Sequence, residues 1–289
     1  MKVLVTGADG FTGRHFCRHA AMAGYEVQEL KSNLLDPHSL KDEIFLAQPD
    51  FVVHLAAVSF VGSPDQSSFY AVNVIGTTNL LDVIAELPKT PKKVLLASSA
   101  NIYGNCDISS IDETVAPNPI NHYAMSKFSM EKMSLTYANK IDLVITRPFN
   151  YTGPGQDVKF VIPKLVECFL NKRPMVSLGN LNVEREFNDV NSVCESYLNL
   201  LTYGVSGETY NVCSGVAYSL KFVIDKLSSM TGHSIKVKID PRFVRSNEVA
   251  LLKGDPGKLE NLLRDSSVKL HKSNLESTLS IMLNDGLKK

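Results

Sequence analysis

A tyrosine and a lysine four residues apart, Tyr123 and Lys127, carry the side chains needed to move a proton at an oxygen atom. On a helix this spacing puts both side chains on one face. A nearby ammonium favours the phenolate and lowers the pKa of the tyrosine toward working pH, so that the phenol can give or take a proton. The same spacing also occurs on ordinary solvated helix faces, so the pair predicts catalysis only together with further residues.

A second group of polar residues, SSANIYG at residues 98–104, precedes this pair in the chain. The group follows a predicted strand over residues 94–98, and a hydroxyl at the end of that strand can hydrogen-bond a substrate oxygen beside Tyr123. We expect Ser99 to do this rather than Ser98, because the residue at the strand's end is better placed in a cleft. The alternative is that both serines only cap the backbone.

Three glycines follow an apolar run at the start of the sequence. Gly7, Gly10 and Gly13 stand between a predicted strand over residues 3–6 and a helical pattern over residues 14–23. Gly7 permits a tight turn, Gly10 lets the backbone approach a pyrophosphate, and Gly13 lets the helix pack on the strand. The helix N-terminus offers N–H groups to phosphates. The alternative to a dinucleotide-binding turn is a merely structural one. The expected cofactor contacts here are Gly7, Asp9, Gly10, Phe11, Thr12 and Gly13.

Strands and helices alternate through the first half of the chain. We predict strands over residues 3–6, 26–30, 51–55, 94–98 and 143–146, and helices over residues 14–23, 39–47, 67–87 and 122–139. This alternation predicts an α/β fold with a Rossmann-type doubly wound parallel sheet, whose ligands lie at the carboxyl ends of the strands. We assign residues 1–150 to the dinucleotide-binding domain and residues 151–289 mainly to a smaller C-terminal α/β substrate-binding lobe, although later strands can return to the first sheet.

Composition excludes several classes of protein. The 289 residues are 44% hydrophobic and include 30 basic and 30 acidic side chains, a balance that gives no support for nucleic-acid binding. No apolar run is long enough to span a membrane. The five cysteines are scattered without CxxC spacing, which predicts a reduced protein with neither disulfides nor a metal site. The sequence enters its first strand at once and leaves no room for a signal peptide, so we expect a cytoplasmic protein.

The motifs occur in the order typical of one family: TGxxGxxG at residues 6–13, HLAA at 54–57, NVIGT at 73–77, SSxxxYG at 98–104 and YxxxK at 123–127. Over nearly its whole length the chain resembles the extended short-chain dehydrogenase/reductases that act on nucleotide sugars. The resemblance implies that Ser99, Tyr123 and Lys127 form the catalytic triad and that the nicotinamide of a bound cofactor passes the hydride. The further cofactor-binding residues expected are Lys31, Ser32, Asn33, Leu34, Leu55, Ala56, Ala57, Asn73, Tyr123, Lys127 and Pro148.

The residue two positions before the tyrosine of the YG pair separates reactions within this family. Similar 4,6-dehydratases carry a glutamate there, and epimerising GDP-fucose synthases carry a cysteine. Here the residue is Asn101, which cannot give or take a proton at ordinary pH, and its neighbour is Ala100. Elimination and epimerisation at C3 or C5 therefore lose their usual acid–base group. Hydride transfer at one carbon remains, by a reductase or by a 4-epimerase.

The end of the second predicted strand bears on the choice of cofactor. An NAD site is expected to place an acidic residue there for the ribose 2′-hydroxyl, but this sequence has Lys31 followed by Ser32. A cation and a hydroxyl suit a 2′-phosphate, so we expect NADP(H), with NAD(H) possible. Glu29 lies two residues earlier and is expected to point away from the ribose. The alternative is that Lys31 is only a solvated loop lysine.

The second half of the chain is similar to reductases of GDP-4-keto-6-deoxy-D-mannose, through RPFNYTGPGQ at residues 147–156, REFNDV at 185–190 and YNVCSG at 210–215. Arg185 and Arg245 each offer a planar fork to a diphosphate. Phe243, Val244 and Ser246 depart from the usual residues around the second arginine, which puts the identity of the nucleotide in doubt. The substrate-binding residues expected are Ser59, Asn101, Asn150, Asn180, Arg185 and Arg245.

The sequence therefore predicts NADPH-dependent reduction of a nucleotide-linked 4-keto-6-deoxyhexose. The expected substrate is GDP-4-keto-6-deoxy-D-mannose, and the expected product is GDP-D-rhamnose or GDP-6-deoxy-talose. One alternative is a nucleotide-sugar 4-epimerase with tightly bound NAD. Another is a non-catalytic NADP(H)-binding protein on the same fold. By resemblance we also expect a homodimer, formed through a helix bundle that includes the helix carrying Tyr123 and Lys127.

Overall fold

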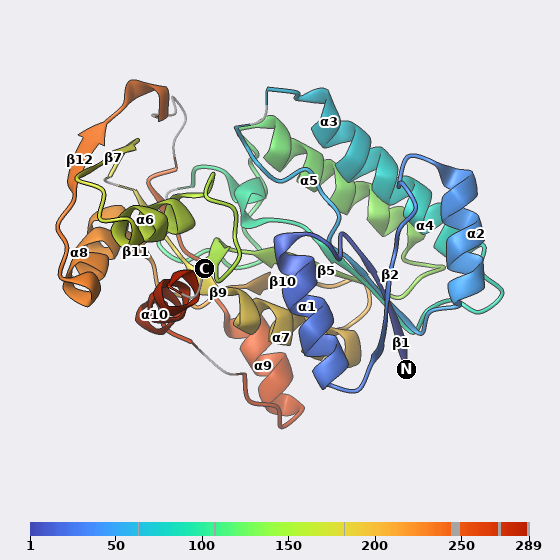
Figure 1. Ribbon diagram of the computed structural model, residues 1–289. Helices are drawn as coiled ribbons and strands as arrows, with labels where there is room; N and C mark the ends of the chain where they lie inside the picture. Colours follow the sequence, from blue (N-terminus) through green and yellow to red (C-terminus); the bar gives the residue numbers. More distant parts are fainter. Residues whose placement is uncertain (63, 107, 182, 244–248, 271–272, 288–289) are drawn as a thin grey trace.

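The computed structural model describes residues 1–289 apart from residues 63, 107, 182, 244–248, 271–272 and 288–289. A six-stranded sheet runs through the molecule in the order β10-β5-β4-β3-β1-β2 (Figure 1). All neighbouring pairs in this sheet are parallel. The strands are β1 (Lys2–Thr6), β2 (Glu26–Glu29), β3 (Phe51–His54), β4 (Lys93–Ala97), β5 (Leu143–Pro148) and β10 (Thr209–Val212).

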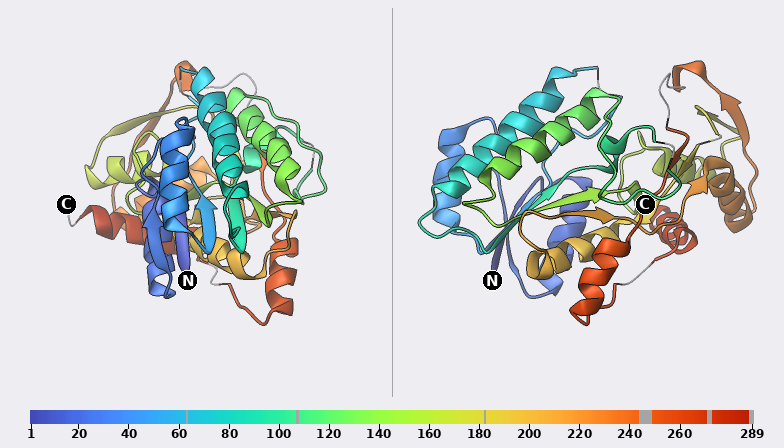
Figure 2. Two further views of the ribbon diagram at one scale, coloured as in Figure 1. Left: turned by 90° about the vertical axis from the view of Figure 1, so that its right-hand side faces the viewer. Right: turned by 180° about the vertical axis from the view of Figure 1, so that it is seen from behind.

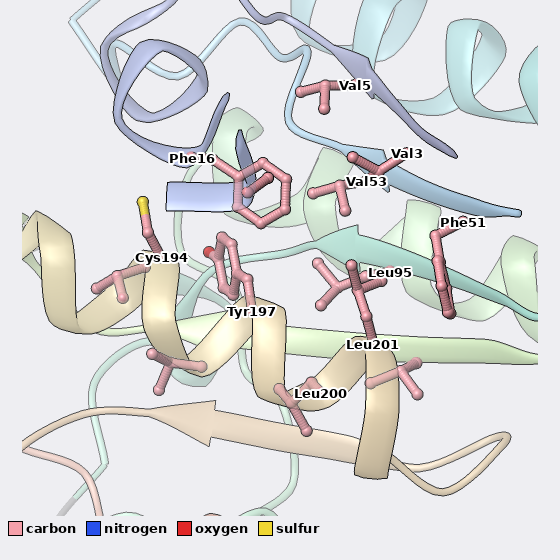
Figure 3. Close-up of a cluster of buried hydrophobic side chains, with 14 of the residues drawn as sticks. Val3, Val5, Phe16, Phe51, Val53, Leu95, Cys194, Tyr197, Leu200 and Leu201 are labelled. Carbon is pink, nitrogen blue, oxygen red and sulfur yellow. The ribbon is translucent and has the colours of Figure 1, made fainter. Parts of the chain in front are cut away.

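Helices cover both faces of this sheet because both faces are apolar. Successive strand residues point to opposite sides. Leu4, Val52 and Leu96 pack beneath one helical layer. Val5 and Leu95 pack beneath the other, which Figure 3 shows. Figure 2 shows α4 and α5 side by side on the first face. The first layer is α2 (Pro37–Ala47), α4 (Thr77–Ala85) and α5 (His122–Ser134), and the second is α1 (Phe11–Met22), α7 (Val190–Tyr203) and α9 (Gly257–Asp265).

The predicted α/β class and parallel sheet are confirmed. The helix predicted over residues 67–87 consists of three pieces: α3 (Ser67–Tyr70), a π-helical segment η1 (Ala71–Gly76) and α4. The helix predicted over residues 122–139 ends earlier as α5 and continues as the 3₁₀ turn η3 (Leu135–Tyr137). A π-helical turn inside a longer helix often marks a functional region. In this chain the π segment holds Asn73 from one of the motifs.

A second group of elements has its own core, seen at the left of Figure 1. Its helices α6 (Val161–Leu170), α8 (Leu220–Thr231) and α10 (Leu275–Gly286) pack beside the parallel pair β7 (Met175–Leu178) and β12 (Lys236–Ile239). Strand β10 and helices α7 and α9 come from this half of the sequence but complete the large sheet and its cover. The short elements are β6 (Tyr151–Thr152), β8 (Glu184–Arg185), β9 (Asn188–Asp189), β11 (Tyr218–Ser219), β13 (Leu251–Leu252), η2 (Ala100–Tyr103) and η4 (Pro241–Phe243).

Candidate active site

The segments that follow β1 to β5 carry most of the predicted site residues. Because all five strands are parallel, these segments meet at one edge of the sheet, where ligands bind in open α/β sheets. The residues on this edge are Gly7 to Gly13 after β1, Lys31 to Leu34 after β2, Leu55 to Ser59 after β3, Ser99 and Asn101 after β4, and Pro148 and Asn150 at the end of β5.

The glycine turn after β1 leaves no room for a side chain at Gly7 or Gly13. Gly7 has a φ of 65°, and a Cβ there would lie 2.7 Å from the Ala56 amide nitrogen. A Cβ on Gly13 would lie 2.1 Å from the Gly7 carbonyl oxygen. Gly10 is the N-cap of α1 and supplies no side chain to it, whereas Asp36 caps α2 and Asn121 caps α5. The first-turn N–H groups of α1 therefore suit an anionic ligand, and the turn fits the diphosphate of NAD(P).

Tyr123 and Ser99 are both buried and lie close to one another. Tyr123 is 8% exposed and Ser99 is 5% exposed. Burial raises the pKa of Tyr123, and its hydrogen bond with Ser99 lowers it by a smaller amount. The pKa of Tyr123 is therefore raised overall, whereas the sequence analysis expected Lys127 to lower it. Desolvation of the phenol is the larger effect, and the Lys127 ammonium is bonded to another group. That group is the carbonyl oxygen of Ala97, which accepts from the Lys127 ammonium at 2.7 Å.

Ser99 is also the N-cap of η2. Its hydroxyl oxygen accepts from the main-chain N–H of Asn101 and from the Asn101 side-chain amide, both at 3.2 Å. Ser98 is equally buried but its hydroxyl has no hydrogen-bond partner among the described residues. The structure therefore places Ser99, rather than Ser98, in a polar arrangement beside Tyr123.

A buried polar network supports α5 behind Lys127. Glu131 accepts two hydrogen bonds from the Arg147 guanidinium, at 3.1 and 2.8 Å. Arg147 also donates to the Tyr103 hydroxyl at 2.9 Å, and Tyr103 donates to the Asn211 side-chain oxygen at 2.8 Å. The network joins α5, β5, η2 and β10. Burial lowers the pKa of Lys127 to about 8, and the negative charge of Glu131 opposes that shift.

A chain of hydrogen bonds fixes the protonation of His54 at the end of β3. Thr77 donates to the Asn73 carbonyl at 2.8 Å, so its hydroxyl must accept from His54 Nε2 at 2.8 Å. His54 Nδ1 then accepts from the Thr6 hydroxyl at 2.7 Å, and Thr6 accepts from the Ala56 N–H at 3.0 Å. Burial and the charge of Lys127 lower the pKa of His54 to about 3. His54 is therefore a neutral bridge between β1 and the segment after β3.

Lys31, just after β2, forms an ion pair with Glu29. Its ammonium lies 2.5 Å from the Glu29 carboxylate. Residues two apart in extended backbone lie on the same side, which accounts for the contact. That Glu29 points away from the ribose of a bound cofactor stays a prediction. Glu43 of α2 accepts from the main-chain N–H groups of Lys31 and Ser32, at 2.9 and 2.7 Å. The loop after β2 is thus held by a carboxylate from the next helix.

Several of the predicted cofactor-binding residues make structural contacts within the protein around the site. The amide of Asn73 is fully buried; it donates to the Val58 carbonyl and the Ser126 hydroxyl and accepts from the Val58 N–H. It therefore ties the segment after β3 to α5. The side chain of Leu34 packs in the core beneath α2 and α4. Thr12 in the first turn of α1 shares a hydrogen bond of 2.7 Å with the Tyr151 hydroxyl.

The predicted substrate residues are spread over both groups of elements. Ser59 and Asn150 are exposed near the carboxyl edge of the large sheet. Asn180 follows β7, and Arg185 lies in β8. Arg185 donates to the main-chain carbonyls of Glu184, Val249 and Ala250, so it holds β8 against the segment before β13. Arg245 lies outside the described residues.

The sequence analysis did not identify the residues that support the site through contacts with other residues. Glu131 follows Lys127 by one helical turn, and this spacing is the one signal that could have found it. Glu43 and the partners of Arg147 gave no local signal. Among the described residues no group of three histidine, cysteine or acidic side chains is arranged to hold a metal ion, and none of the described helices is long and apolar enough to cross a membrane.

Known proteins resemble this chain along most of its length. A family model described as "NAD dependent epimerase/dehydratase family" matches residues 3–213. The GDP-6-deoxy-D-talose 4-dehydrogenase of Aggregatibacter actinomycetemcomitans is 37% identical over 269 residues, covering 91% of each chain. The GDP-6-deoxy-D-mannose reductase of Pseudomonas aeruginosa is 30% identical over 275 residues, covering 90% of each chain. The solved structure of RMD from Pseudomonas aeruginosa complexed with NADPH matches with a TM-score of 0.89, 29% identity and 98% coverage of each chain.

Proposed function

Because the chain belongs to the NAD-dependent epimerase/dehydratase family, within the extended short-chain dehydrogenase/reductases, we propose that it reduces the 4-keto group of a nucleotide-linked 4-keto-6-deoxyhexose. The protein is an NAD(P)-dependent oxidoreductase, and the resemblance drawn from its sequence is confirmed. The proposed substrate is GDP-4-keto-6-deoxy-D-mannose, and the proposed cofactor is NADPH. The product is GDP-D-rhamnose or its C4 epimer, GDP-6-deoxy-talose.

Tyr123 and Ser99 perform the proton chemistry in this proposal. Bound NADPH supplies a hydride to C4 of the sugar. Tyr123 donates its phenolic proton to the C4 oxygen, so the carbonyl becomes a secondary alcohol and the tyrosine becomes a phenolate. Ser99 donates a hydrogen bond to the same oxygen and stabilises the negative charge that develops there. Solvent then restores the proton of Tyr123, which balances the reaction.

The glycine turn and the polar residues around it would hold the cofactor. The first turn of α1 offers its N–H groups to the diphosphate, and the close approach of Gly7 to Ala56 leaves the adjoining surface to the nucleotide. Lys31 and Ser32 are proposed to contact the 2′-phosphate of NADPH. Lys127 is proposed to hydrogen-bond the ribose next to the nicotinamide, since its ammonium lies at the carboxyl end of β4.

The observation that carries the choice of reaction is the amide of Asn101 beside Ser99 and Tyr123. A 4,6-dehydratase needs an acid–base group that works on C5 and C6, and a 3,5-epimerase needs one for the neighbouring carbons. Positions 100 and 101 hold an alanine and an asparagine, and the asparagine amide is engaged with Ser99 at 3.2 Å. Tyr123 is then the group beside Ser99 that can transfer a proton, which supports hydride transfer at C4 alone.

The names of the two relatives support a GDP-linked substrate and differ in one respect. GDP-6-deoxy-D-talose and GDP-6-deoxy-D-mannose are epimers at C4, so the two relatives are named for opposite configurations at that carbon. We propose that Arg185, Arg245, Asn150 and Asn180 bind the diphosphate and nucleoside. Residues 151–289, apart from β10, α7 and α9, are proposed to form the substrate-binding lobe. A cytoplasmic homodimer is the proposed form of the protein.

The first experiment mixes the protein with enzymatically generated GDP-4-keto-6-deoxy-D-mannose and NADPH and follows the nicotinamide absorbance. Stoichiometric loss of absorbance supports the reductase, and chromatography of the product against both C4 epimers assigns the face of hydride delivery. The Tyr123→Phe variant is the matched control for contaminating activity. No loss with either NADPH or NADH from folded protein contradicts the proposal.

A nucleotide-sugar 4-epimerase is the second candidate, favoured by the acidic surroundings of Lys31. Glu29 contacts the Lys31 ammonium and Glu43 holds the adjoining main chain, an arrangement that suits NAD better than NADP. Protein that retains NAD through purification and interconverts a GDP-hexose at C4 would support this reading. Turnover of any sugar nucleotide by the wild-type protein would exclude the third candidate, a non-catalytic NADP(H)-binding protein.

A further inference from the structure

We propose that Asn101 is a positioning residue that makes the Ser99 hydroxyl an obligatory hydrogen-bond donor toward the reacting oxygen. This inference rests on the proposed ketone reduction and deepens it. It assigns Asn101 a role through Ser99, besides the contact with the sugar expected from the sequence.

The hydrogen bonds around Ser99 determine the direction of its own proton. A hydroxyl has two acceptor lone pairs and one proton. Both acceptor sites of Ser99 are occupied, by the main-chain N–H and the side-chain amide of Asn101, each at 3.2 Å. Ser99 is only 5% exposed, so bulk water does not compete for these positions. The Ser99 proton can therefore only be donated to a third group.

The third group is Tyr123 or an oxygen that lies beside it. Ser99 lies close enough to Tyr123 to lower the pKa of the phenol, and a serine whose two acceptor sites are filled can interact with it only as a donor. A serine free to accept would instead receive a hydrogen bond from the neutral phenol, which would make Tyr123 a weaker acid. A serine fixed as donor instead supports both the phenolate and the oxygen that gains charge during reduction.

The backbone of η2 explains why two donors of residue 101 reach the Ser99 hydroxyl. Ser99 has extended backbone with a φ of −161° and caps η2, so the N–H of residue 101 turns back to its hydroxyl. The short asparagine side chain reaches the same oxygen from the same residue. An aspartate of equal size has only acceptor atoms when ionised, so it would accept a hydrogen bond from the Ser99 hydroxyl and reverse the direction of the bond.

The test compares the kcat for ketone reduction by wild type, Asn101→Ala, Asn101→Asp and Ser99→Ala, with Asn105→Ala as a control on an exposed asparagine just beyond the same turn. We expect Asn101→Ala to lower kcat about 3- to 10-fold with little change in KM, because it loses one hydrogen bond and keeps the main-chain one. Asn101→Asp should lose more activity than Asn101→Ala. In the Ser99→Ala background, either change at residue 101 should alter kcat by no more than about twofold.

Two results would overturn the inference. One is an Asn101→Asp variant with wild-type kcat. The other is a loss from Asn101→Ala that is as large without the Ser99 hydroxyl as with it, since residue 101 would then act independently of Ser99. A circular dichroism spectrum shows whether each variant is folded, and the isosteric aspartate keeps the test valid if the alanine variant is not.

A substrate-free measurement separates this inference from the proposed function. The ionisation of Tyr123 is followed by ultraviolet difference absorbance between each variant and the same variant carrying Tyr123→Phe. The phenolate should form at higher pH in Asn101→Asp than in wild type, and at the wild-type pH in Asn105→Ala. The effect of Asn101→Asp should be much smaller in the Ser99→Ala background, which separates the hydrogen bond of Ser99 from the charge of the aspartate. If wild type reduces no ketosugar but this shift is seen, the proposed function fails and the role of Asn101 stands. Identical titrations in active protein reject the role of Asn101 alone.

Discussion

The ammonium of Lys127 donates a hydrogen bond of 2.7 Å to the carbonyl oxygen of Ala97, the last residue of β4. This bond joins the helix that carries Tyr123 to the strand that leads into Ser99. Lys127 is 3% exposed, so its charge is held almost out of water. The same lysine that serves the proposed chemistry therefore also holds α5 against the end of β4, and with it the two other members of the proposed triad, at a cost in desolvation.

That cost makes the stability of the protein depend on pH in a direction that can be measured. The pKa of Lys127 falls from 10.5 to about 8 in the folded state. Between these two pH values the unfolded chain binds more protons, so the free energy of unfolding should rise as pH rises through this window. Lys127→Met removes the titrating group, and its unfolding free energy should lack that rise. Urea denaturation at about pH 7 and about pH 10 measures the difference.

The control for this experiment is Lys140→Met, a change at an exposed lysine beyond α5. It should leave the pH dependence of unfolding as in wild type. If Lys127→Met and Lys140→Met show the same pH dependence, the buried ammonium is not the source of the effect.

The Glu131–Arg147 ion pair should contribute much more to stability than a surface pair. Its side chains are 2% and 8% exposed, and removing one partner of a buried pair costs about 3–5 kcal/mol because the other charge is left uncompensated. Glu131→Gln should therefore lower the unfolding free energy by about that amount. It should also lower the pKa of Lys127 further, since Glu131 opposes the effect of burial on that group.

A matched surface pair provides the comparison. Lys41 and Glu86 lie 2.6 Å apart with side chains about half exposed, and Glu86→Gln should cost only about 0–1 kcal/mol. Denaturation curves of the two variants at one pH measure both effects. Equal losses would show that the Glu131–Arg147 pair is not energetically distinct from a solvated one.

The sequence contained enough local information to predict the glycine turn, the strands around it and the helix carrying Tyr123 and Lys127. Each of these depends on residues close together in the chain, such as Gly7, Gly10 and Gly13. The parallel sheet followed because alternating strands and helices have few ways to pack. The return of β10 to this sheet was left open, since a strand of only four residues, two of them polar, does not indicate which strand it pairs with.

The supporting network could not be predicted for a related physical reason. Tyr103 and Asn211 are separated by 108 residues along the chain, and their hydrogen bond exists only because β5 lies between β4 and β10. Glu43 reaches the loop after β2 from the middle of a helix whose pattern reads as an ordinary amphipathic one. Such contacts depend on the packed fold, and no single residue type or spacing in the sequence predicts them.

The preference between NADPH and NADH should depend on the charges at the end of β2. Lys31 is proposed to contact the 2′-phosphate, but Glu29 now holds its ammonium. Lys31→Ala should raise the KM for NADPH about tenfold and leave the KM for NADH nearly unchanged, because only NADPH carries the phosphate. Glu29→Gln should lower the KM for NADPH, since it releases Lys31 and removes a repulsive charge. Equal changes for the two cofactors in both variants would contradict the assignment of Lys31.

The phenol of Tyr123 is the group on which the proposed reaction depends most directly. Tyr123→Phe removes the hydroxyl and keeps the ring, which packs against Phe69 with 5.9 Å between ring centroids, so the fold should be preserved. We expect kcat to fall by about 10²–10⁴-fold, the range for losing a general acid, while the dissociation constant for NADPH stays near its wild-type value. Stopped assays of product and fluorescence titration of NADPH measure the two quantities separately. A variant that keeps a near-normal kcat would remove Tyr123 from the mechanism, whereas loss of NADPH binding would place its hydroxyl in the cofactor site and not at the reacting oxygen.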